Sequence, residues 1–437
     1  MRILILSNYP WKNNNSFGNT YSSIFGKIPN VEIAHVYMFD GMPDDVPNVT
    51  RYYQILEKDV MKSAFKRVQP VGREVFVGQD FEGTAPGGGE KKSLHPYSRL
   101  LSFGKRHHWY SLFFARELAW KLGKVNFEDL MSFIDDFKPD IFFLPYSYVF
   151  YTNRIALYIK EHYDIPMVME MAMDHYTLKR VSWNPLFWLD RFAKRKQIRK
   201  LVEQSEMMFV ISKKLKEEIE SHLNIKCQVL YKTPDACRSI EAYKGTEKVV
   251  KFLFTGNIYS NRWKSLAMLA QSLKKQDFGH LDIYTASPIT PAISKSLNID
   301  GYSEIHPPVS QAEVINLQNK ADVLVHAEAF DSYNKSLVRC AISTKIMDYL
   351  SVGRCILAIG PSDISSIEYL SENKIALVAD SQQTLDNEIS KIKVSPQIIS
   401  EFAQKSQDYS QKHLNSEEMR QKLYNDLQLV IDNYKQK

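Results

Sequence analysis

The chain has 437 residues, of which 44% are hydrophobic and 24% are charged, with 17 glycines and 18 prolines. This composition excludes a disordered, collagenous or fibrous chain, and the length predicts two or three domains. The formal net charge of +6 is too small for a dedicated nucleic-acid-binding protein, so we expect no nucleic-acid partner, and no apolar run is long enough to predict a membrane-spanning helix.

The chain begins with a short apolar run, residues 2–7, that no small-residue cleavage site follows. We therefore expect a first core strand here and not a signal peptide. The four cysteines, Cys227, Cys237, Cys340 and Cys355, show no C-x-x-C spacing. Their scatter argues against a zinc site and a disulfide framework, and it favours the reducing environment of the cytoplasm.

Short apolar runs alternate with amphipathic stretches along most of the chain. Each run is too short for a helix and almost wholly apolar, as expected of parallel strands covered on both faces. The runs are residues 2–7, 32–39, 140–146, 165–171 and 207–212 in the first half, and residues 251–256, 281–285, 321–327, 354–360 and 375–380 in the second. Helix-like stretches between them include residues 126–137, 212–223, 263–275 and 310–320. This alternation predicts an α/β protein with parallel sheets.

Two blocks of about five strands predict two doubly wound, Rossmann-like domains, because a single sheet of ten parallel strands is less usual. We place the first domain at residues 1–235 and the second at residues 246–412. The break between them falls near residues 232–248, a polar segment with a proline and a glycine.

Two further stretches complete the predicted organisation. An irregular segment at residues 78–100, with three consecutive glycines, predicts a loop inserted in the first domain. The end of the chain predicts two helices, at residues 396–413 and 416–434. We expect the last of them, with residues up to 437, to pack back on the first domain.

Several motifs of cofactor and metal chemistry are absent from the sequence. There is no G-x-G-x-x-G after a strand, no H-E-x-x-H and no D-x-D. The nearest approach to a P-loop, residues 83–88, is followed by Gly89 where a lysine is required. We therefore expect no dinucleotide site, no resident cofactor and no dedicated metal site.

The most informative segment is residues 342–360. It predicts a helix from Thr344 or Lys345, capped by Ser343 or Thr344 and ended by a glycine in the left-handed conformation, with a strand directly after it. A helix N-terminus with a hydroxyl and a lysine is suited to bind phosphate. Asp348 lies on the same helical side as Lys345 and can accept two hydrogen bonds from a vicinal diol such as ribose. The alternative is an ordinary capped helix with a Lys/Asp surface pair.

A second informative segment, residues 252–264, holds a strand that ends at Gly256, a polar loop that begins with Asn257, and the start of a helix. Ligands of open α/β sheets bind at the carboxyl ends of strands, and Gly256 lets a substrate approach the backbone closely. Arg262 and Lys264 are cations at a helix start, where the helix dipole disfavours them. An anionic ligand would offset that cost, and the alternative is a solvated loop.

The first domain also has a glycine between a strand and a helix, as the second domain has at Gly256. Gly18 and Asn19 follow the first strand and a polar loop, at the start of a helix-like run to residue 25. We expect both to face the cleft between the domains. The alternative is a plain strand-to-helix loop.

Three segments in this order resemble a known family: Phe-Thr-Gly-Asn at residues 254–257, the stretch 309–325, and Ser-Thr-Lys-Ile-Met-Asp at residues 343–348. They resemble the GT-B-fold glycosyltransferases, most nearly the retaining family 4 group, over about residues 250–380. The first half is similar only in its strand order and in one apolar run that leads into a basic helix. The resemblance implies two facing Rossmann-like domains with a cleft between them, a nucleoside diphosphate sugar on the second domain and the acceptor mainly on the first.

The resemblance also assigns roles to the candidate residues. It implies that Arg262 and Lys264 hold the diphosphate of the donor. It implies further phosphate contacts from Ser343, Thr344 and Lys345. In the same way it gives the ribose hydroxyls to Asp348.

The family has an acidic pair with the spacing E-x7-E, from which this sequence departs. The second position of the pair falls on Asp348, and the first falls on Cys340. Glu328 and Asp331 follow the strand at residues 321–327 and are candidates to replace the missing carboxylate near the donor sugar.

In the first domain, Asp174 and His175 follow the strand at residues 165–171, at its carboxyl end. Similar enzymes often carry a histidine near this position, close to the reacting sugar. His175 is a candidate to orient a hydroxyl, and Asp174 to act as base or to hold the imidazole. The alternative is a hydrogen-bonded loop pair with no catalytic task. Tyr146 and Ser147 are weaker candidates for the cleft.

Residues 179–200 contain eight basic residues and one acidic residue, with aromatic residues between them. Residues 105–124 have a similar composition, whereas His107 and His108 are not expected to be ligands. Such stretches can lie on anionic lipid, which a lipid-linked acceptor would explain. The alternative is a helix whose aromatic residues pack inward and whose cations face water. We expect a cytoplasmic protein, peripheral on the inner face of the membrane if this segment binds lipid.

These observations favour a metal-independent glycosyltransferase of polysaccharide biosynthesis, with a nucleoside diphosphate sugar as its donor substrate and a glycan or lipid-linked acceptor. Two alternatives stay open. One is a nucleotide-sugar epimerase of the same fold, and the other is a non-catalytic protein of this fold, which the cysteine at position 340 suggests.

Overall fold

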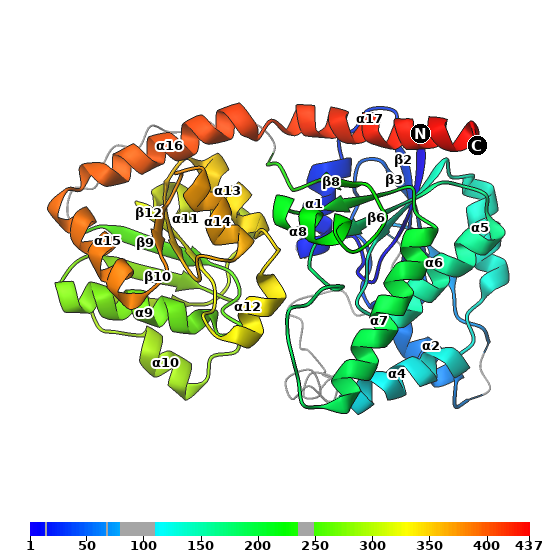
Figure 1. Ribbon diagram of the computed structural model, residues 1–437, viewed down its shortest axis with the longest axis horizontal. Helices are drawn as coiled ribbons and strands as arrows, with labels where there is room; N and C mark the ends of the chain where they lie inside the picture. The colour runs from blue at the N-terminus through cyan, green and yellow to red at the C-terminus, as the bar shows by residue number, and fades with distance from the viewer. Residues whose placement is uncertain (14, 67–68, 79–109, 235–248) are drawn as a thin grey trace.

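The computed structural model describes residues 1–13, 15–66, 69–78, 110–234 and 249–437. Two α/β domains lie side by side, each built on one mainly parallel sheet with helices around it (Figure 1). The predicted fold class is therefore confirmed. The loop expected at residues 78–100 lies, after Gly78, outside the described residues, and so do His107, His108 and residues 235–248 of the expected linker.

The sheet of the first domain has eight strands in the order β4-β3-β2-β1-β5-β6-β7-β8, and only β4 runs antiparallel to its neighbour. Their bounds are Arg2–Leu6 (β1), Glu32–Tyr37 (β2), Val49–Gln54 (β3), Arg73–Val75 (β4), Ile141–Pro145 (β5), Met167–Met171 (β6), Met207–Val210 (β7) and Cys227–Val229 (β8). The five predicted strands are present. The predicted apolar runs do not include β3, which carries polar residues, or β4 and β8, which have only three residues each.

The sheet of the second domain has six parallel strands in the order β11-β10-β9-β12-β13-β14. Their bounds are Lys251–Thr255 (β9), His280–Tyr284 (β10), Ser303–His306 (β11), Val323–Ala327 (β12), Cys355–Ile359 (β13) and Leu377–Ala379 (β14). The sequence missed only β11. This edge strand is short and has one apolar residue among its four, so it gives no apolar run.

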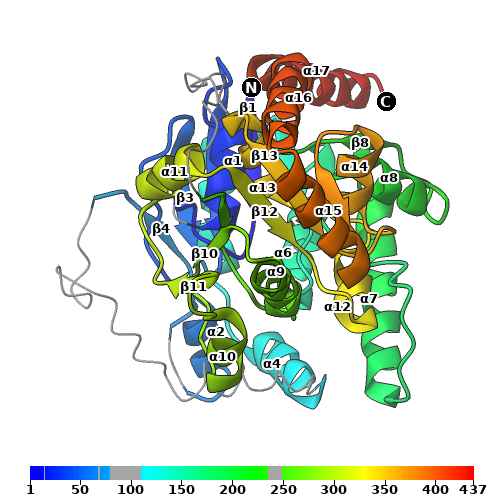
Figure 2. The ribbon, with the colours of Figure 1, turned by 90° about the vertical axis from the view of Figure 1, so that its left-hand side faces the viewer.

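Helices connect the strands and cover the sheets (Figures 1 and 2). In the first domain they are α1 Ser16–Phe25, α2 Glu57–Ser63, α4 Tyr110–Leu122, α5 Phe127–Phe137, α6 Phe150–His162, α7 Pro185–Glu203 and α8 Lys213–Glu220. In the second they are α9 Arg262–Gln276, α10 Pro291–Leu297, α11 Gln311–Lys320, α12 Ser332–Val338, α13 Thr344–Val352, α14 Ser365–Glu372, α15 Gln382–Val394 and α16 Gln397–His413.

The last helix, α17 (Ser416–Lys435), crosses from the second domain back to the first (Figure 1). Asn415 caps it by accepting hydrogen bonds from the amides of Glu417 and Glu418. Leu423 and Leu427 join the apolar core beneath α1, and Arg420 donates to the carbonyl of Ser23 at 2.9 Å. The chain therefore ties the two domains together at both the β8–β9 connection and the α16–α17 connection.

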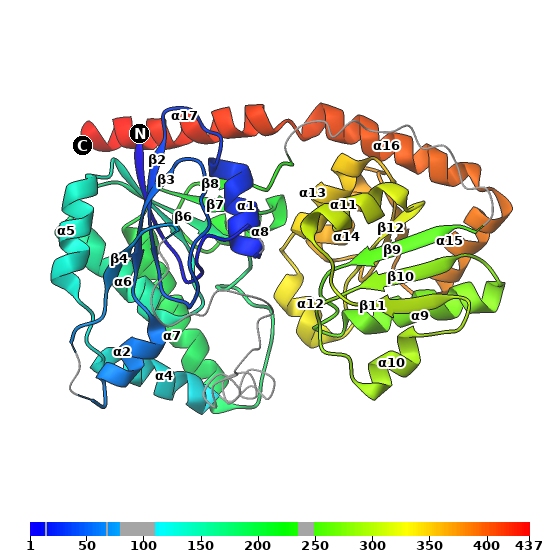
Figure 3. The ribbon, with the colours of Figure 1, turned by 180° about the vertical axis from the view of Figure 1, so that it is seen from behind.

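The domains meet through loops that follow the carboxyl ends of strands. Ser212, directly after β7, donates from its hydroxyl to the carbonyl of Cys340 at 2.6 Å. Helix α1 of the first domain stands at the edge nearest α11 of the second (Figure 3). In open α/β sheets this end of the strands is where ligands bind.

Candidate functional site

A pocket of about 310 Å³ lies between the two domains. Its first-domain wall comes from α1 and the loop before it, and its second-domain wall comes from the end of β9, from α11 and from the first turns of α13. The predicted residues that line it are Asn19, Gly256, Asn257, Thr344, Lys345 and Asp348. Segments more than 300 positions apart in the sequence therefore form one site.

The N-terminus of α13 opens into this pocket. Ser343 is the N-cap, as predicted, but its side chain accepts no hydrogen bond from the first turn. The Ser343 amide instead donates to the hydroxyl of Ser366 at 3.1 Å. Gly353 ends the helix with φ +66°, which confirms the predicted left-handed end. The first turn thus keeps amide donors, and the positive end of the helix dipole, for a ligand.

Lys345 supplies the charge of the pocket. Its Nζ lies 4.6 Å from the centre of the Phe254 ring and forms no hydrogen bond or ion pair with any residue that the structure describes. Gly256, with φ +128°, makes room for it, because a Cβ atom at this position would overlap the lysine Nζ. Burial, followed by the nearby charge of Arg262, lowers the pKa of Lys345 to about 8. A half-buried cation without an anionic partner is well suited to bind an anion.

Arg262 lies close enough to Lys345 to lower its pKa, does not itself line the pocket, and is held in place by a carboxylate. Glu328 accepts two hydrogen bonds from its guanidinium, at 2.9 and 3.0 Å. Nε2 of His326 lies 3.6 Å from the same carboxylate, and burial lowers the pKa of this histidine to about 4, so it is neutral. From the sequence, Glu328 is a candidate for the carboxylate near the donor sugar, whereas here it orients Arg262.

Lys264 does not join this group, which corrects the expectation that Arg262 and Lys264 act as a pair. It is exposed, its Nζ lies 5.7 Å from the centre of the Trp263 ring, and it does not line the pocket. Residues two apart on a helix point to nearly opposite sides, so one ligand does not reach both. Asp331 lies on that side of the loop and accepts a hydrogen bond from Asn261 at 2.9 Å.

Asp348 faces the first domain across the pocket. It accepts a hydrogen bond from Nζ of Lys232 at 2.6 Å, and Lys232 is itself buried. The carboxylate keeps its second oxygen for a ligand. No local pattern indicates Lys232, because it lies 116 positions before its partner Asp348 in the chain.

Gly18 and Asn19 lie in α1, and their roles differ. Gly18 is buried, and a Cβ atom there would overlap the backbone of Lys12, so this glycine permits close packing of the preceding loop. Asn15 caps the helix by accepting from the Gly18 amide at 2.7 Å. Only Asn19 lines the pocket. The predicted position of Asn19 at the cleft is therefore confirmed, and that of Gly18 is wrong.

Asp174 and His175 follow β6 in a tight turn. The Asp174 carboxylate accepts from the amides of Tyr176, Thr177 and Leu178, and also from Arg339 of the second domain at 3.0 Å. It is saturated with hydrogen bonds, and none of those described joins it to His175. The expectation that Asp174 acts as base or holds the imidazole therefore disagrees with the geometry, which gives this carboxylate the task of holding the turn.

No described hydrogen bond engages the imidazole of His175, and this residue does not line the pocket at the start of α13. Burial, followed by the charge of Lys194, lowers its pKa to about 4, so the imidazole is neutral at pH 7. Its ring lies 5.2 Å from the Tyr146 ring, and the Tyr146 hydroxyl is buried without a described hydrogen-bond partner. Ser147 is already engaged, since it accepts from Asn8 at 2.5 Å.

No family model matches the chain, and no curated protein matches its sequence. Solved structures do match. A sucrose-phosphate synthase from Thermosynechococcus elongatus has a TM-score of 0.63 and 9% identity over 99% of both chains. HepE from Anabaena, in complex with UDP and glucose, has a TM-score of 0.60 and 10% identity over 98% of this chain and 99% of that one. WaaG, a glycosyltransferase involved in lipopolysaccharide biosynthesis, has a TM-score of 0.54 and 12% identity, with 97% and 98% covered.

The chain has the GT-B fold. At these identities the likeness establishes the architecture of two facing Rossmann-like domains, and the chemistry has to be argued from the residues of the site. In this GT-B fold the pocket of Lys345 and Asp348 lies at the domain junction, on the carboxyl side of both sheets.

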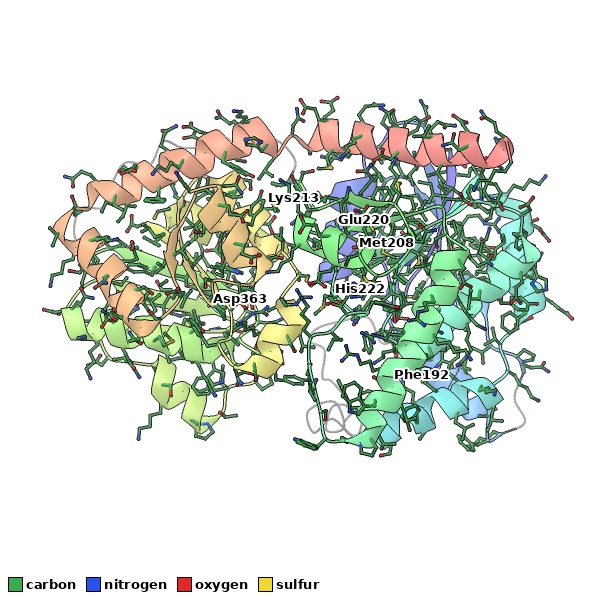
Figure 4. All side chains as sticks on the ribbon, in the orientation of Figure 1. Phe192, Met208, Lys213, Glu220, His222 and Asp363 are labelled. Carbon is green, nitrogen blue, oxygen red and sulfur yellow. The ribbon has the colours of Figure 1, made fainter. Side chains whose placement is uncertain are left out.

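The basic segment that leads into and forms α7 departs from its expected packing. Arg191 and Arg195 turn inward and donate to backbone carbonyls of residues 176–180. Large apolar side chains are exposed instead, and Figure 4 labels Phe192 among them. We call this group the α7 patch: Val181, Trp183, Leu189 and Phe192. The alternative of inward aromatic residues and outward cations therefore holds in part: Phe187 is buried and Lys196 and Lys200 face water, whereas the α7 patch is exposed.

Among the residues that the structure describes, no group of three or more His, Cys, Asp or Glu side chains is placed to hold a metal ion. In the same ranges we find no helix with the length and apolar character needed to cross a membrane.

Proposed function

We propose that this protein is a glycosyltransferase that moves a sugar from a nucleoside diphosphate sugar to a glycan or lipid-linked acceptor in polysaccharide biosynthesis, with retention and without a metal ion. The observation that carries the proposal is the Lys345 ammonium, which lacks a described anionic partner at the N-terminus of α13. It faces a pocket between the two domains of a GT-B fold. HepE, which shares this fold, was solved in complex with UDP and glucose.

Charge at the site suits a diphosphate leaving group. When the bond between the sugar carbon and the diphosphate oxygen breaks, negative charge develops on that oxygen. Lys345 and the amides at the start of α13 are fixed in place to stabilise it, and Thr344 adds a hydroxyl. Arg262 adds positive charge close to Lys345. The free oxygen of Asp348 is placed to accept from ribose hydroxyls.

Proton transfer follows from the state of His175. An imidazole with a pKa near 4 is a poor base at pH 7, so His175 donates its ring N–H to the oxygen of the acceptor hydroxyl and orients it, which leaves the hydroxyl proton for the leaving group. The acceptor oxygen bonds to the sugar carbon, and its proton passes to the departing diphosphate oxygen. This route places acceptor and leaving group on one face of the sugar, which suits retention.

The α7 patch supports a lipid-linked acceptor. Trp183 is fully exposed and Phe192 is 69% exposed, beside the exposed cations Lys196 and Lys200. Exposed aromatic and basic side chains together favour the surface of an anionic membrane. We therefore place the enzyme in the cytoplasm, at the inner face of the membrane.

The test is titration calorimetry of the full chain with a panel of nucleoside diphosphates and their sugars. We expect one nucleoside diphosphate to bind, and Lys345→Met to weaken its binding by about 100-fold, because a buried charge contact of this kind contributes about 2–3 kcal/mol. Lys274→Met, an exposed lysine in the last turn of α9, is the matched control and should bind as the wild type does.

Product analysis separates the alternatives. Transfer should require an acceptor. A changed sugar formed from the donor alone would indicate an epimerase. Absence of binding by every nucleoside diphosphate would leave a non-catalytic protein of the GT-B fold.

A further inference from the structure

Arg339 reaches from the second domain into the first. It lies between α12 and α13, and its guanidinium bridges two carboxylates of the first domain, at 3.0 Å from Asp174 and 2.7 Å from Glu218. It also donates to the hydroxyl of Thr177 at 3.2 Å. The side chain of Arg339 is 11% exposed and that of Asp174 is 1% exposed, so this contact is shielded from water.

The carboxylate that Arg339 holds is the one that shapes the turn of His175. Asp174 accepts three backbone amides from residues 176–178, which folds the chain around the imidazole. The carbonyls of the same turn are held by Arg191 and Arg195 from α7. Among these described cations, only Arg339 comes from the opposite domain.

Glu218 shows how tightly the bridge is made. Burial alone would raise its pKa, but hydrogen bonds from Lys179 and Arg339 outweigh burial and lower the pKa to about 2. If the domains separated, Asp174 would lose its cation from the second domain, whereas Glu218 would keep Lys179 of its own domain. A buried carboxylate that loses its cation is destabilised, so the turn would lose its present form.

We infer that Arg339 is a positioning residue: it makes the placement of His175 depend on contact between the two domains. The inference rests on the proposed function, because His175 has a role only if a sugar is transferred to an acceptor hydroxyl. Its consequence is that the acceptor side of the site is complete only when the donor-binding domain is docked, which limits loss of activated sugar to water.

A second pair of contacts between the domains provides the matched control. Lys214 donates to Glu368 at 2.6 Å and to the carbonyl of Asp363 at 2.7 Å. Figure 4 labels its neighbour Lys213 in the first domain and Asp363 in the second. No described hydrogen bond or ion pair joins Lys214 to the turn at residues 174–178, so its loss weakens contact between the domains without altering the bonds of that turn.

The experiment compares Arg339→Met, Arg339→Lys and Lys214→Met in the full chain. We expect Arg339→Met to lower kcat by about 100-fold, since a displacement of about 1 Å at a reacting group has this effect. The donor Kd should stay within about twofold, because the donor pocket is intact. Arg339→Lys keeps the positive charge but lacks the planar guanidinium that binds two carboxylates at once. Its kcat should therefore lie between those of Arg339→Met and the wild type. Lys214→Met should change kcat by less than about threefold.

A spectroscopic readout needs neither donor nor turnover. In protein with ¹⁵N-labelled histidine, the His175 signal, assigned by its loss in His175→Gln, should titrate near pH 4 in the wild type and in Lys214→Met. In Arg339→Met it should move up towards the ordinary value of about 6.5, because the opened turn admits water.

The outcomes are distinct. An unchanged His175 titration and unchanged kcat in Arg339→Met would overturn the inference. If Arg339→Met does not fold, as judged by its thermal transition, Arg339→Lys decides the question by the same two readouts. A shifted titration in a protein that binds no nucleoside diphosphate would support the role of Arg339 in the turn and reject the proposed function.

Discussion

The ammonium of Lys345 occupies the space that a Cβ atom at Gly256 would fill. The glycine that ends β9 and the lysine that begins α13 therefore form one feature, although 89 positions separate them. This corrects the simpler expectation that Gly256 only lets a substrate approach the backbone. It admits the side chain that we propose binds the diphosphate.

Gly256→Ala should weaken donor binding without removing Lys345. The new methyl group would displace Nζ, and an L-residue at φ +128° is strained. We expect the donor Kd to rise by about tenfold or more, which corresponds to about 1.4 kcal/mol. Gly301→Ala is the control, since nothing lies within 4 Å of its Cβ position, and it too has a positive φ. Equal Kd values for the two variants would contradict the account.

Donor binding should fall as the pH rises above about 8. Only the protonated form of Lys345 attracts the diphosphate, and its pKa is lowered to about 8. A bound anion favours the protonated form, so the loss should begin near pH 8 and continue upward. Calorimetry between about pH 6.5 and 9.5 measures it, in a range where phosphate groups are already ionised. Lys345→Met should bind weakly at every pH, and a steep dependence in that variant would assign the titration to another group.

Asp348→Asn should weaken the binding of ribonucleotides selectively. The carboxylate is placed to accept from ribose hydroxyls, and one such hydrogen bond to a charged group contributes about 1.5–3 kcal/mol. We expect the Kd of a nucleoside diphosphate to rise by about tenfold or more, and that of inorganic pyrophosphate to stay nearly constant. Equal losses for both ligands would mean that Asp348 acts on the phosphates, through Lys232, and not on the ribose.

The free energy of unfolding of the Glu170→Gln variant, relative to that of the wild type, should increase as the pH rises. Burial raises the pKa of Glu170 from 4.5 to about 7, although Tyr21 donates to it at 2.7 Å. The folded protein therefore holds this proton more tightly than the unfolded chain does, and the wild type loses stability as pH rises from about 4.5 to 7. Relative to wild type, the variant should gain up to about 3 kcal/mol between pH 5 and 8. Denaturant unfolding of both proteins at pH 5 and pH 8 measures this gain. If the difference in unfolding free energy between variant and wild type did not depend on pH, the prediction would be contradicted.

The double variant Trp183→Ser with Phe192→Ser should lower binding to anionic vesicles. Both side chains belong to the α7 patch, and loss of their burial in lipid should reduce bound protein by about tenfold or more. Flotation with vesicles of phosphatidylserine and phosphatidylcholine measures it. Val394→Ser, an equally exposed apolar residue of the second domain, is the control. Wild-type protein that fails to float at low salt would exclude the membrane surface as a partner.

Much of the fold and half of the candidate site follow from local sequence. The α13 segment contains a capping residue, an apolar side and a terminal glycine. These local signals predict the helix, its N-cap position and the place of its lysine. The short strands β4 and β8 could not, because three residues give no periodicity.

What local sequence could not show are contacts between distant segments. Lys232 and Arg339 gave no signal, since their partners lie 116 and 165 positions away. The same holds for the inward turn of Arg191 and Arg195. Composition shows that cations and aromatic residues alternate, but the carbonyls at residues 176–180 decide which of them turn inward. Arg262 and Lys264 are close in sequence, but two positions on a helix point to nearly opposite sides, so they do not face one ligand.

The central claim is that the pocket at the start of α13 receives the diphosphate of a nucleotide sugar. A crystal structure of the protein with the nucleoside diphosphate that binds most tightly tests it directly. We predict phosphate oxygens within hydrogen-bond distance of Lys345 and of the first α13 amides, and a ribose hydroxyl on Asp348. A nucleotide bound elsewhere in the protein, with Lys345 left unchanged against Phe254, would contradict it.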